Sequence, residues 1–457
     1  MKSLSPDGPL VYCESAAYYG GSFTSVVNLI RHLRHLTDIK VIDVYGTCVP
    51  YIEDLKRLGI SPVVLFPDWH GRTIIGGQNR IERSARMALS IPHSLRVVAR
   101  LRKTLADLRP RAMWVDQEKT LFFASLAAPR ALPIAVNRTA DLSRILPYCT
   151  FAWRRADLTF GVSQSCLQYL RTTNYSHHNF RVLYYGIDSV DVLERAQSKP
   201  ANLPNSEDGT LQIVFPASLA DPHKGHEFGI RAVAEFIRQG GKANLLVCGS
   251  VPPGASRAFG DKMFALACEL NVKEHVHFLG YREDILSIMA KSDIVFLPSL
   301  VEGVPRSLME AMALAKPVVA TAVSGTPELV RDEIDGILVP PRDVPALTEA
   351  LWALTNSNVR NRMGRSGQQR VRESFSVTQQ AQEFVSIMDA LVSRRSRGDL
   401  GGGRGRNGAS VVGSEQFGDT IADGRSGQHR GSRGFSAMRE ASEFLDVLDS
   451  LTNKATL

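Results

Sequence analysis

The chain has few of the features that hold a metal or anchor a protein outside the cytoplasm. Its six cysteines are scattered without a Cys-x-x-Cys pair, so we expect thiols in a reducing compartment. No apolar run reaches the roughly 18 residues of a spanning helix, and we expect no signal segment. Asp-x-Asp pairs, cysteine–histidine clusters and Walker-type loops are also absent. The sequence therefore predicts a cytoplasmic protein that uses no metal or other cofactor.

What is present is an alternation of short apolar runs with helix-period segments such as 24–36 and 96–108. This pattern is typical of buried parallel strands joined by helices, and 457 residues are too many for one ordinary core. We therefore expect an α/β fold with two Rossmann-like domains facing a central cleft. The predicted strands are 10–14, 39–45, 62–66, 112–115, 133–136, 158–162, 211–216, 244–248, 275–279, 294–297, 317–320 and 337–339.

Changes in composition suggest where the domains begin and end. A polar stretch at 197–209 separates the two alternating regions, and a segment rich in glycine and arginine begins at Gly398. We accordingly assign an N-terminal domain, a C-terminal domain, a terminal helix that returns to the first domain, and a C-terminal extension. Their ranges are 1–195, 196–375, 376–397 and 398–457.

The extension contains a copy of the terminal helix. The sequence GRSGQQR that begins at Gly364 recurs as GRSGQHR at Gly424, and 13 of 29 aligned positions are identical. Chance would give on the order of two identities. We predict that the first copy, 377–391, is the structural helix and that 398–457 are dispensable.

The most informative segment, residues 296–330, reads as strand, acidic loop, helix, strand, glycine loop and helix. Pro305 lies where the helix begins, so the amides of Arg306, Ser307 and Leu308 would face an anion. Taken alone, Glu302 and Glu310 are better explained as a turn residue and a solvated helix residue than as the lining of a cleft.

The whole segment resembles the retaining glycosyltransferases of the GT-B fold, in particular family 4. The resemblance is carried by Glu302, Gly303, Pro305, the run EAMA from Glu310, the Pro-Val-Val-Ala strand from Pro317 and the Gly-Thr-Pro-Glu loop from Gly325. It implies that Glu310 binds the ribose hydroxyls of a nucleotide and that Glu302 lies beside the donor sugar. It also implies a hexosyltransferase that retains anomeric configuration.

Further resemblances extend this interpretation across residues 10–392. Gly20 and Gly21 resemble a loop that approaches the donor diphosphate, although paired glycines before a helix are more often a simple turn. Lys224 matches a lysine that grips the diphosphate, but the usual arginine position falls near Ser218, which carries no charge. The usual histidine is replaced around Arg138, which is either a substitute phosphate ligand or a solvated loop residue.

A basic segment, residues 72–111, has ten basic residues against two acidic ones. Its second half places Leu95, Val98, Leu101, Leu105 and Leu108 on one predicted helix face. The segment is either a peripheral contact with the inner membrane or a core helix with a solvated back. No aromatic residues interleave the arginines, which argues against nucleic-acid binding.

These features together predict a transferase that moves a sugar from a nucleotide diphospho-sugar to a glycan or lipid-linked acceptor. The expected setting is bacterial surface polysaccharide or glycolipid assembly. Two alternatives stay open: a degenerate nucleotide-sugar-binding protein without turnover, and a GT-B-fold epimerase or phosphorylase.

Overall fold

The computed structural model describes nine stretches of the chain. They are residues 7–15, 20–67, 80–116, 118–138, 152–172, 179–200, 203–204, 209–251 and 256–397, with the backbone alone for 80–91, 118, 138 and 169–172. Contacts group Met1–Arg72 with Ile91–Arg397 in one compact unit. Of the second unit, Thr73–Ser90 and Gly398–Leu457, only the helical backbone of 80–90 is described. The duplicated helix therefore lies outside the described residues.

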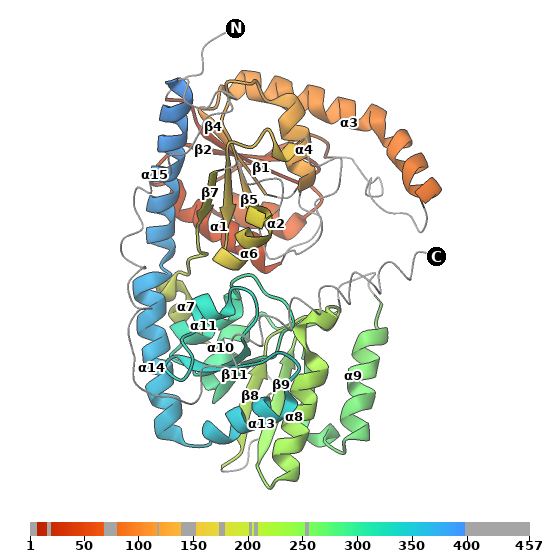
Figure 1. Cartoon of the computed structure of the whole chain (residues 1–457), viewed down its shortest axis with the longest axis vertical. Helices are drawn as coiled ribbons and strands as arrows, with labels where there is room; N and C mark the ends of the chain where they lie inside the picture. The colour runs from red at the N-terminus through yellow and green to blue at the C-terminus, as the bar shows by residue number, and fades with distance from the viewer. Residues whose placement is uncertain are drawn as a thin grey trace. The chain divides into compact units, whose positions relative to one another are not determined.

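The first domain contains a seven-stranded parallel sheet in the order β3-β2-β1-β4-β5-β6-β7 (Figure 1). The strands are β1 (Leu10–Glu14), β2 (Ile39–Asp43), β3 (Val63–Val64), β4 (Ala112–Asp116), β5 (Ile134–Arg138), β6 (Leu158–Gly161) and β7 (Asn179–Val182). Residues in β1 and β4 are almost completely buried, as expected when helices cover both faces of a parallel sheet. The six predicted strands of this domain are confirmed, whereas β7 was not predicted because its residues are only partly buried.

Helices follow most strands of this domain. They are α1 (Gly21–Leu33), α2 (Val49–Arg57), α3 (Arg80–Leu108), α4 (Glu118–Ala127), α6 (Gln164–Thr172) and α7 (Ser189–Arg195). Helix α7 is capped by Asp188, whose side chain accepts hydrogen bonds from the amides of Val190 and Asp191.

Helix α3 corrects two predictions. It begins at Arg80 rather than near Arg96 and continues through Pro92. Leu95, which the periodicity placed on the apolar face, is 64% exposed, and Val97 is buried instead beside Leu101. The error arises because the apolar stripe of this helix begins after Leu95 and runs through Val97 and Val98.

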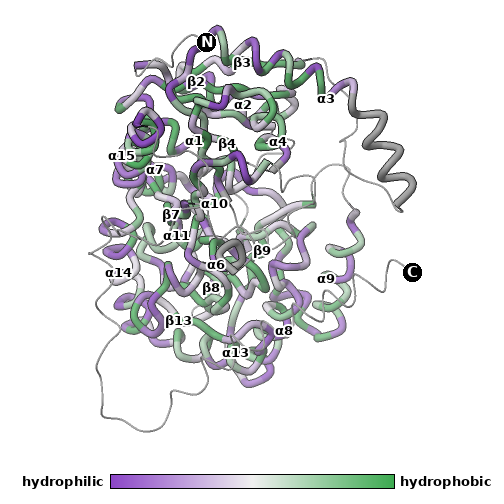
Figure 2. Tube along the Cα trace, turned by 45° about the horizontal axis from the view of Figure 1, so that its top comes forward, coloured by the Kyte–Doolittle hydropathy of each residue, from purple (hydrophilic) through white to green (hydrophobic). Residues whose placement is uncertain are grey.

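The second domain contains a six-stranded parallel sheet in the order β10-β9-β8-β11-β12-β13. Its strands are β8 (Leu211–Phe215), β9 (Ala243–Cys248), β10 (Val276–Gly280), β11 (Ile294–Leu297), β12 (Val318–Thr321) and β13 (Gly336–Val339). All six were predicted to within one residue at each end, since buried apolar runs of this length are typical of parallel strands. In Figure 2 the surface helices of this domain alternate between hydrophobic and hydrophilic stretches, as amphipathic helices do.

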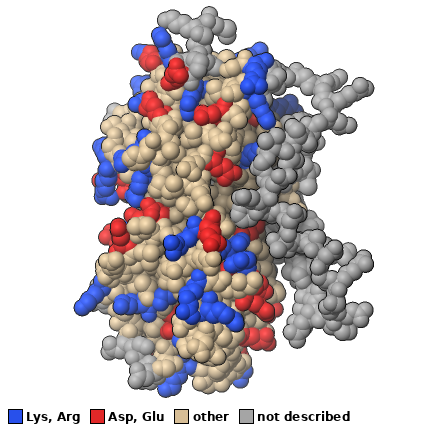
Figure 3. Space-filling view, turned by 90° about the vertical axis from the view of Figure 1, so that its left-hand side faces the viewer, with Lys and Arg blue, Asp and Glu red and all other residues tan. Residues whose placement is uncertain are grey.

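The helices of the second region are α8 (His226–Arg238), α9 (Ala258–Glu269), α10 (Ile285–Lys291), α11 (Arg306–Ala313), α12 (Thr326–Leu329), α13 (Val344–Ala353), α14 (Ser357–Ser374) and α15 (Val377–Ser396), with 3-10 turns at Pro222–Lys224 and Lys273–His275. Figure 3 shows basic side chains interspersed with acidic ones on the face that includes α14 and α15. Helix α14 contributes five arginines to the chain.

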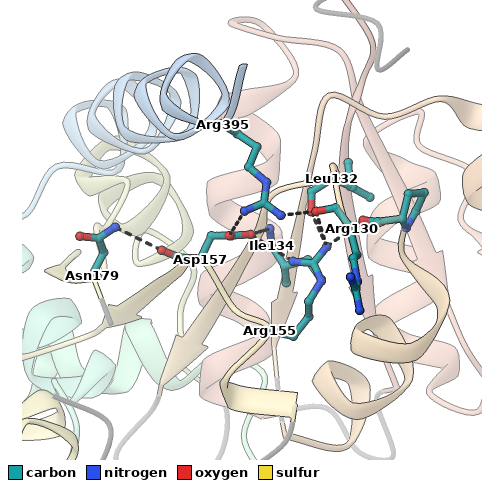
Figure 4. A network of polar contacts seen from close by, with 8 residues as sticks. Arg130, Leu132, Ile134, Arg155, Asp157, Asn179 and Arg395 are labelled. Atoms are coloured by element: carbon teal, nitrogen blue, oxygen red, sulfur yellow. Dashed lines mark hydrogen bonds and ion pairs between the residues drawn. The ribbon is translucent and has the colours of Figure 1, made fainter. Parts of the chain in front are cut away.

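Helix α15 packs against α1 of the first domain. Its Phe384 side chain is buried and lies beside the ring of Trp114 in β4, with 4.8 Å between the ring centroids. The end of the helix is tied to the first domain by a polar network (Figure 4), in which Arg395 pairs with Asp157 at 3.1 Å. Asp157 also accepts from the Ile134 amide and pairs with Arg155. The aligned position in the duplicated segment is Ala455, which cannot make this ion pair.

The chain passes between the two sheets at two adjacent places. Gly186 lies against the backbone of Val377, where a Cβ would come within 2.4 Å of the Val377 Cα. The Ile187 amide donates to the Phe375 carbonyl at 2.8 Å, and Gln380 accepts from the Gly186 amide. Glycine is required at 186 because any side chain would separate these two segments.

Candidate active site

The predicted acidic residues lie at the carboxyl edge of the second sheet. The acidic loop, defined here as residues 298–305, connects the end of β11 at Leu297 to the first residue of α11, Arg306. Ligands of open parallel sheets bind at this edge, because the loops that follow the strands gather there. The architecture therefore presents the loop where a donor molecule would be held.

Glu302 is 8% exposed and has two hydrogen-bond donors. Lys224 Nζ lies 2.7 Å from its Oε1 atom, and Ser299 Oγ donates to the same atom at 2.7 Å. A carboxylate removed from water needs such compensation. The structure thus brings the predicted Lys224 and Glu302 together as a direct ion pair and adds Ser299, which the sequence analysis did not identify.

Gly225 explains why Lys224 can reach the acidic loop. Gly225 has a φ of +75°, and a Cβ there would lie 1.8 Å from the Pro298 carbonyl oxygen. The Leu300 amide also donates to the His223 carbonyl at 2.7 Å. The turn that carries Lys224 therefore packs directly against the loop that carries Glu302.

Glu310 pairs with Arg306 one turn earlier on α11. Arg306 Nε lies 2.8 Å from Glu310 Oε1, and the two side chains are 12% and 15% exposed. When the Asn28 amide is turned so that its oxygen faces Arg306, that oxygen accepts from Nη1 and Nη2 at 3.0 Å. Asn28 belongs to α1 of the first domain and is buried. Neither Asn28 nor the side-chain role of Arg306 was predicted, since nothing in the local sequence links them.

The beginning of α11 requires a correction. Pro305 is the residue before the helix, not its first residue. The Leu308 amide donates to the Pro305 carbonyl at 3.1 Å and is therefore already used. The predicted anion donors in the first turn are reduced to the amides of Arg306 and Ser307.

The two glycines at the start of α1 differ from those around the acidic loop. Gly20 is extended, with φ −143° and ψ −177°, and Gly21 opens the helix. A Cβ at Gly21 would meet no atom of the described residues within 4 Å, so packing among those residues does not explain that glycine. Its suggested role beside a diphosphate stays a prediction. By contrast, the Gly303 carbonyl would lie 2.1 Å from a Cβ at Gly325, so packing alone explains a glycine at 325.

Ser218 and Arg138, which stand where the family that this chain resembles usually has an arginine and a histidine, have different surroundings. Ser218 is partly buried, and its hydroxyl donates to the Ser250 carbonyl at 2.9 Å. Arg138 ends β5, and its side chain lies outside the described residues. The proposed compensation by Arg138 therefore stays a prediction.

Glu328, in the predicted Gly-Thr-Pro-Glu loop, contacts the first domain. Its carboxylate accepts from the amides of Gln164 and Ser165 at the start of α6, at 2.8 and 3.1 Å, and from the Tyr184 hydroxyl at 2.8 Å. An acid at a helix N-terminus satisfies free amides and interacts favourably with the helix dipole. The motif indicated that this glutamate matters, but its partners come from residues far away in the sequence.

The strands of the first sheet also end in buried acids. Glu14 in β1 and Asp43 in β2 are paired in register, and Asp116 in β4 is paired with Asn137 in β5. Burial raises the pKa of Asp116 to about 7, against a hydrogen bond from Asn137 that lowers it. Because the folded value exceeds the unfolded value, this group reduces stability progressively as the pH rises from about 4 to about 7.

Several arginines of the predicted basic face make contacts within the protein. Arg100 lies over the Phe66 ring at 4.2 Å, Arg102 donates to the Leu126 carbonyl, and Arg111 pairs with Asp389 at 3.2 Å. Residues 72–79 and the side chains of 80–91 lie outside the described part. Within the described residues, no helix is both long and apolar enough to span a membrane.

The sequence of the second domain matches a known family. Residues 210–357 match the family model described as Glycosyl transferases group 1. This region is therefore similar in sequence to a group 1 glycosyl transferase domain. The match covers β8 to β13 and the acidic loop, but not the first domain.

The curated relatives that match this chain cover only part of it. A D-inositol 3-phosphate glycosyltransferase of Mycobacterium marinum is 34% identical over 43% of this chain and 41% of its own length. A UDP-Gal:alpha-D-GlcNAc-diphosphoundecaprenol alpha-1,3-galactosyltransferase of Escherichia coli is 28% identical over 31% and 37%. An Escherichia coli K12 protein named for colanic acid biosynthesis, WcaL, is 26% identical over 56% and 63%. The matches thus span less than two thirds of these relatives.

Solved structures extend the similarity to both domains. Anabaena HepE in complex with UDP has a TM-score of 0.64 at 18% identity, over 84% of this chain and all of that one. Sucrose-phosphate synthase of Thermosynechococcus elongatus gives 0.65 at 19% identity, over 84% and 99%. The predicted fold class, two parallel-sheet α/β domains of the GT-B type, is confirmed.

Proposed function

We propose that the protein is a retaining glycosyltransferase that moves a hexose from a nucleotide diphospho-sugar to an acceptor. The family of its second domain supports transfer of a glycosyl group. Of the structural relatives, HepE is described in complexes with UDP and with UDP-glucose. We extend that class of ligand to this chain.

The observation that carries the proposal is the position of two carboxylates on one loop and helix. Glu302 accepts hydrogen bonds from Lys224 and Ser299. Glu310 lies on α11, the helix that follows the same loop. We assign Glu310 to the ribose hydroxyls through its Oε2 atom, since Arg306 contacts Oε1. We assign Glu302 to the donor sugar and Lys224 to the diphosphate. This ion pair would then lie beside the glycosidic bond that breaks.

The reaction follows from this assignment. As the glycosidic bond to the diphosphate breaks, negative charge grows on the leaving oxygen and positive charge on the sugar. Lys224 and the Arg306 and Ser307 amides would stabilise the first, and Glu302 the second. Retention follows if the acceptor hydroxyl attacks from the face that the diphosphate leaves and gives its proton to the departing diphosphate oxygen. We propose that no metal takes part.

We further propose an acceptor of glycan or lipid-linked type, in bacterial surface polysaccharide or glycolipid assembly. The Escherichia coli relatives named for a diphosphoundecaprenol acceptor and for colanic acid support this setting. A cytoplasmic enzyme peripheral to the inner membrane through residues 72–111 would meet such acceptors. Exposed Arg96 and Lys103 are available to that surface.

The decisive experiment measures nucleotide release from a panel of UDP-, GDP- and ADP-sugars, with and without candidate acceptors. We expect release from one nucleotide class, lost in Glu302→Gln. The exposed lysine variant Lys40→Ala serves as a control that should leave release unchanged, because Lys40 on β2 pairs with the exposed Asp38 just before that strand. No release with any donor, from a folded protein, would overturn the proposal.

A binding protein without turnover is the second candidate. It is favoured by Ser218, which stands where the family's usual arginine would be and is hydrogen bonded to Ser250. Calorimetry separates the two candidates: binding of a nucleotide sugar with no release in any acceptor mixture favours the binding protein.

A further inference from the structure

We propose that Arg306 is a positioning residue that couples nucleotide binding in the second domain to Asn28 in the first. The inference rests on the proposed function, because it takes Glu310 as the ligand of the nucleotide ribose. It adds that the Glu310 carboxylate is held by a chain of contacts, Asn28–Arg306–Glu310, that crosses from α1 to α11.

The geometry divides the Arg306 guanidinium between two acceptors. Its Nε faces Glu310 Oε1 at 2.8 Å, while Nη1 and Nη2 both donate to the Asn28 amide oxygen at 3.0 Å once that amide is turned to face them. A planar guanidinium can satisfy both directions at once, whereas a lysine ammonium cannot hold this fork. Arg306 therefore fixes the rotamer of Glu310 and leaves Oε2 directed to a ligand.

Burial makes this arrangement specific. Asn28 is 6% exposed, and the side chains of Arg306 and Glu310 are 12% and 15% exposed. An exposed pair at the same helical spacing contributes little, because water competes for both groups. Here, loss of one member leaves the next without its acceptor or donor in a partly dehydrated place.

The position of Asn28 gives the coupling its consequence. Helix α1 begins at Gly21, and Gly20 and Gly21 are the predicted diphosphate loop. Asn28 lies two turns further along the same helix. The ribose ligand and the proposed diphosphate loop are thus joined through one rigid helix, so that displacement of α1 would release Glu310 as well.

The test is a double-mutant cycle on nucleotide affinity, with UDP, GDP and ADP as probes in calorimetry on the full chain. We expect Asn28→Ala and Arg306→Lys each to raise the dissociation constant about tenfold, because each variant loses a charge-assisted hydrogen bond. Asn28→Ala should add less than about twofold when Glu310 is already alanine, because the contacts act in series. Arg238→Lys on α8, whose exposed side chain pairs with Glu235, is the matched control and should change nothing.

Three outcomes decide between this coupling and simpler explanations. Rescue of affinity in Asn28→Asp, whose carboxylate still accepts from Arg306, supports the relay even if Asn28→Ala folds poorly. A lowered melting temperature with an unchanged dissociation constant in both Asn28→Ala and Arg306→Lys, or fully additive losses with Glu310→Ala, overturns it while the proposed function stands. A parent protein that binds none of the three nucleotides overturns the proposed function itself and the relay with it.

Discussion

Removing Lys224 should destabilise the protein even before any substrate is present. In the structure Lys224 Nζ lies 2.7 Å from Glu302 Oε1, and Glu302 is 8% exposed. Lys224→Ala leaves that carboxylate with the Ser299 hydroxyl as its remaining donor among the described residues. Loss of a hydrogen bond between charged groups costs about 2 kcal/mol. For a domain of this size that corresponds to a fall in melting temperature of about 4–8 °C.

The assay is thermal unfolding without ligand, followed by a double-mutant cycle. Glu302→Gln in the Lys224→Ala background should recover about half of the loss, because a neutral amide is less costly to leave buried than a carboxylate. Lys40→Ala, which breaks an exposed pair with Asp38, should stay within about 0.5 kcal/mol of the parent. An unchanged melting temperature in Lys224→Ala, or no recovery in the double variant, would refute the buried pair. Turnover should be nearly abolished in Lys224→Ala and in the Lys224→Ala/Glu302→Gln double variant, since the cation for the diphosphate is gone.

Four further predictions follow from the site and the fold. Glu310→Ala should weaken nucleotide binding by about 1.5–3 kcal/mol in calorimetry, and unchanged affinity would remove Glu310 from the ribose. EDTA should leave the rate unchanged, and collapse of the rate with recovery on adding Mg²⁺ would contradict the metal-free proposal. Asp116→Asn should raise the free energy of unfolding at pH 8 by up to about 4 kcal/mol relative to the parent and have little effect at pH 4, because burial raises the pKa of Asp116 to about 7. Chemical unfolding at both pH values checks this, and equal differences between variant and parent at the two pH values would contradict the raised pKa. Truncation after Arg397 should give a soluble and active product, since α15 already packs on α1; an insoluble product would assign the structural role to the second copy.

The sequence was sufficient for most of the regular structure. Buried parallel strands are continuous apolar runs, so β8 and β11 could be read directly. The buried face of a half-exposed helix is harder to predict, because assigning one residue wrongly rotates the predicted apolar face around the helix axis. Leu95 was therefore assigned to the wrong face, and partly buried β7 escaped notice.

The contacts between distant residues were beyond the sequence for a different reason. The motif indicates that Glu302, Glu310 and Glu328 matter, but their partners are set by the fold. Lys224 meets Glu302 and the start of α6 meets Glu328 only after the chain has folded, as does Asn28 with Arg306, the partner of Glu310. A pattern within one segment contains no information on such pairs.

Two glycines show how far a motif can be explained without a ligand. A Cβ at Gly225 would collide with the Pro298 carbonyl oxygen, and one at Gly325 with the Gly303 carbonyl oxygen. Both carbonyls belong to the acidic loop, so a glycine supports that loop from either side. Packing against the acidic loop therefore requires glycine at both positions. Substitution of either glycine should displace Glu302 without removing a side chain that could touch a substrate. Gly21 differs because a Cβ there would meet no atom within 4 Å in the part of the chain that the structure describes. Its replacement should therefore report on donor binding rather than on the acidic loop.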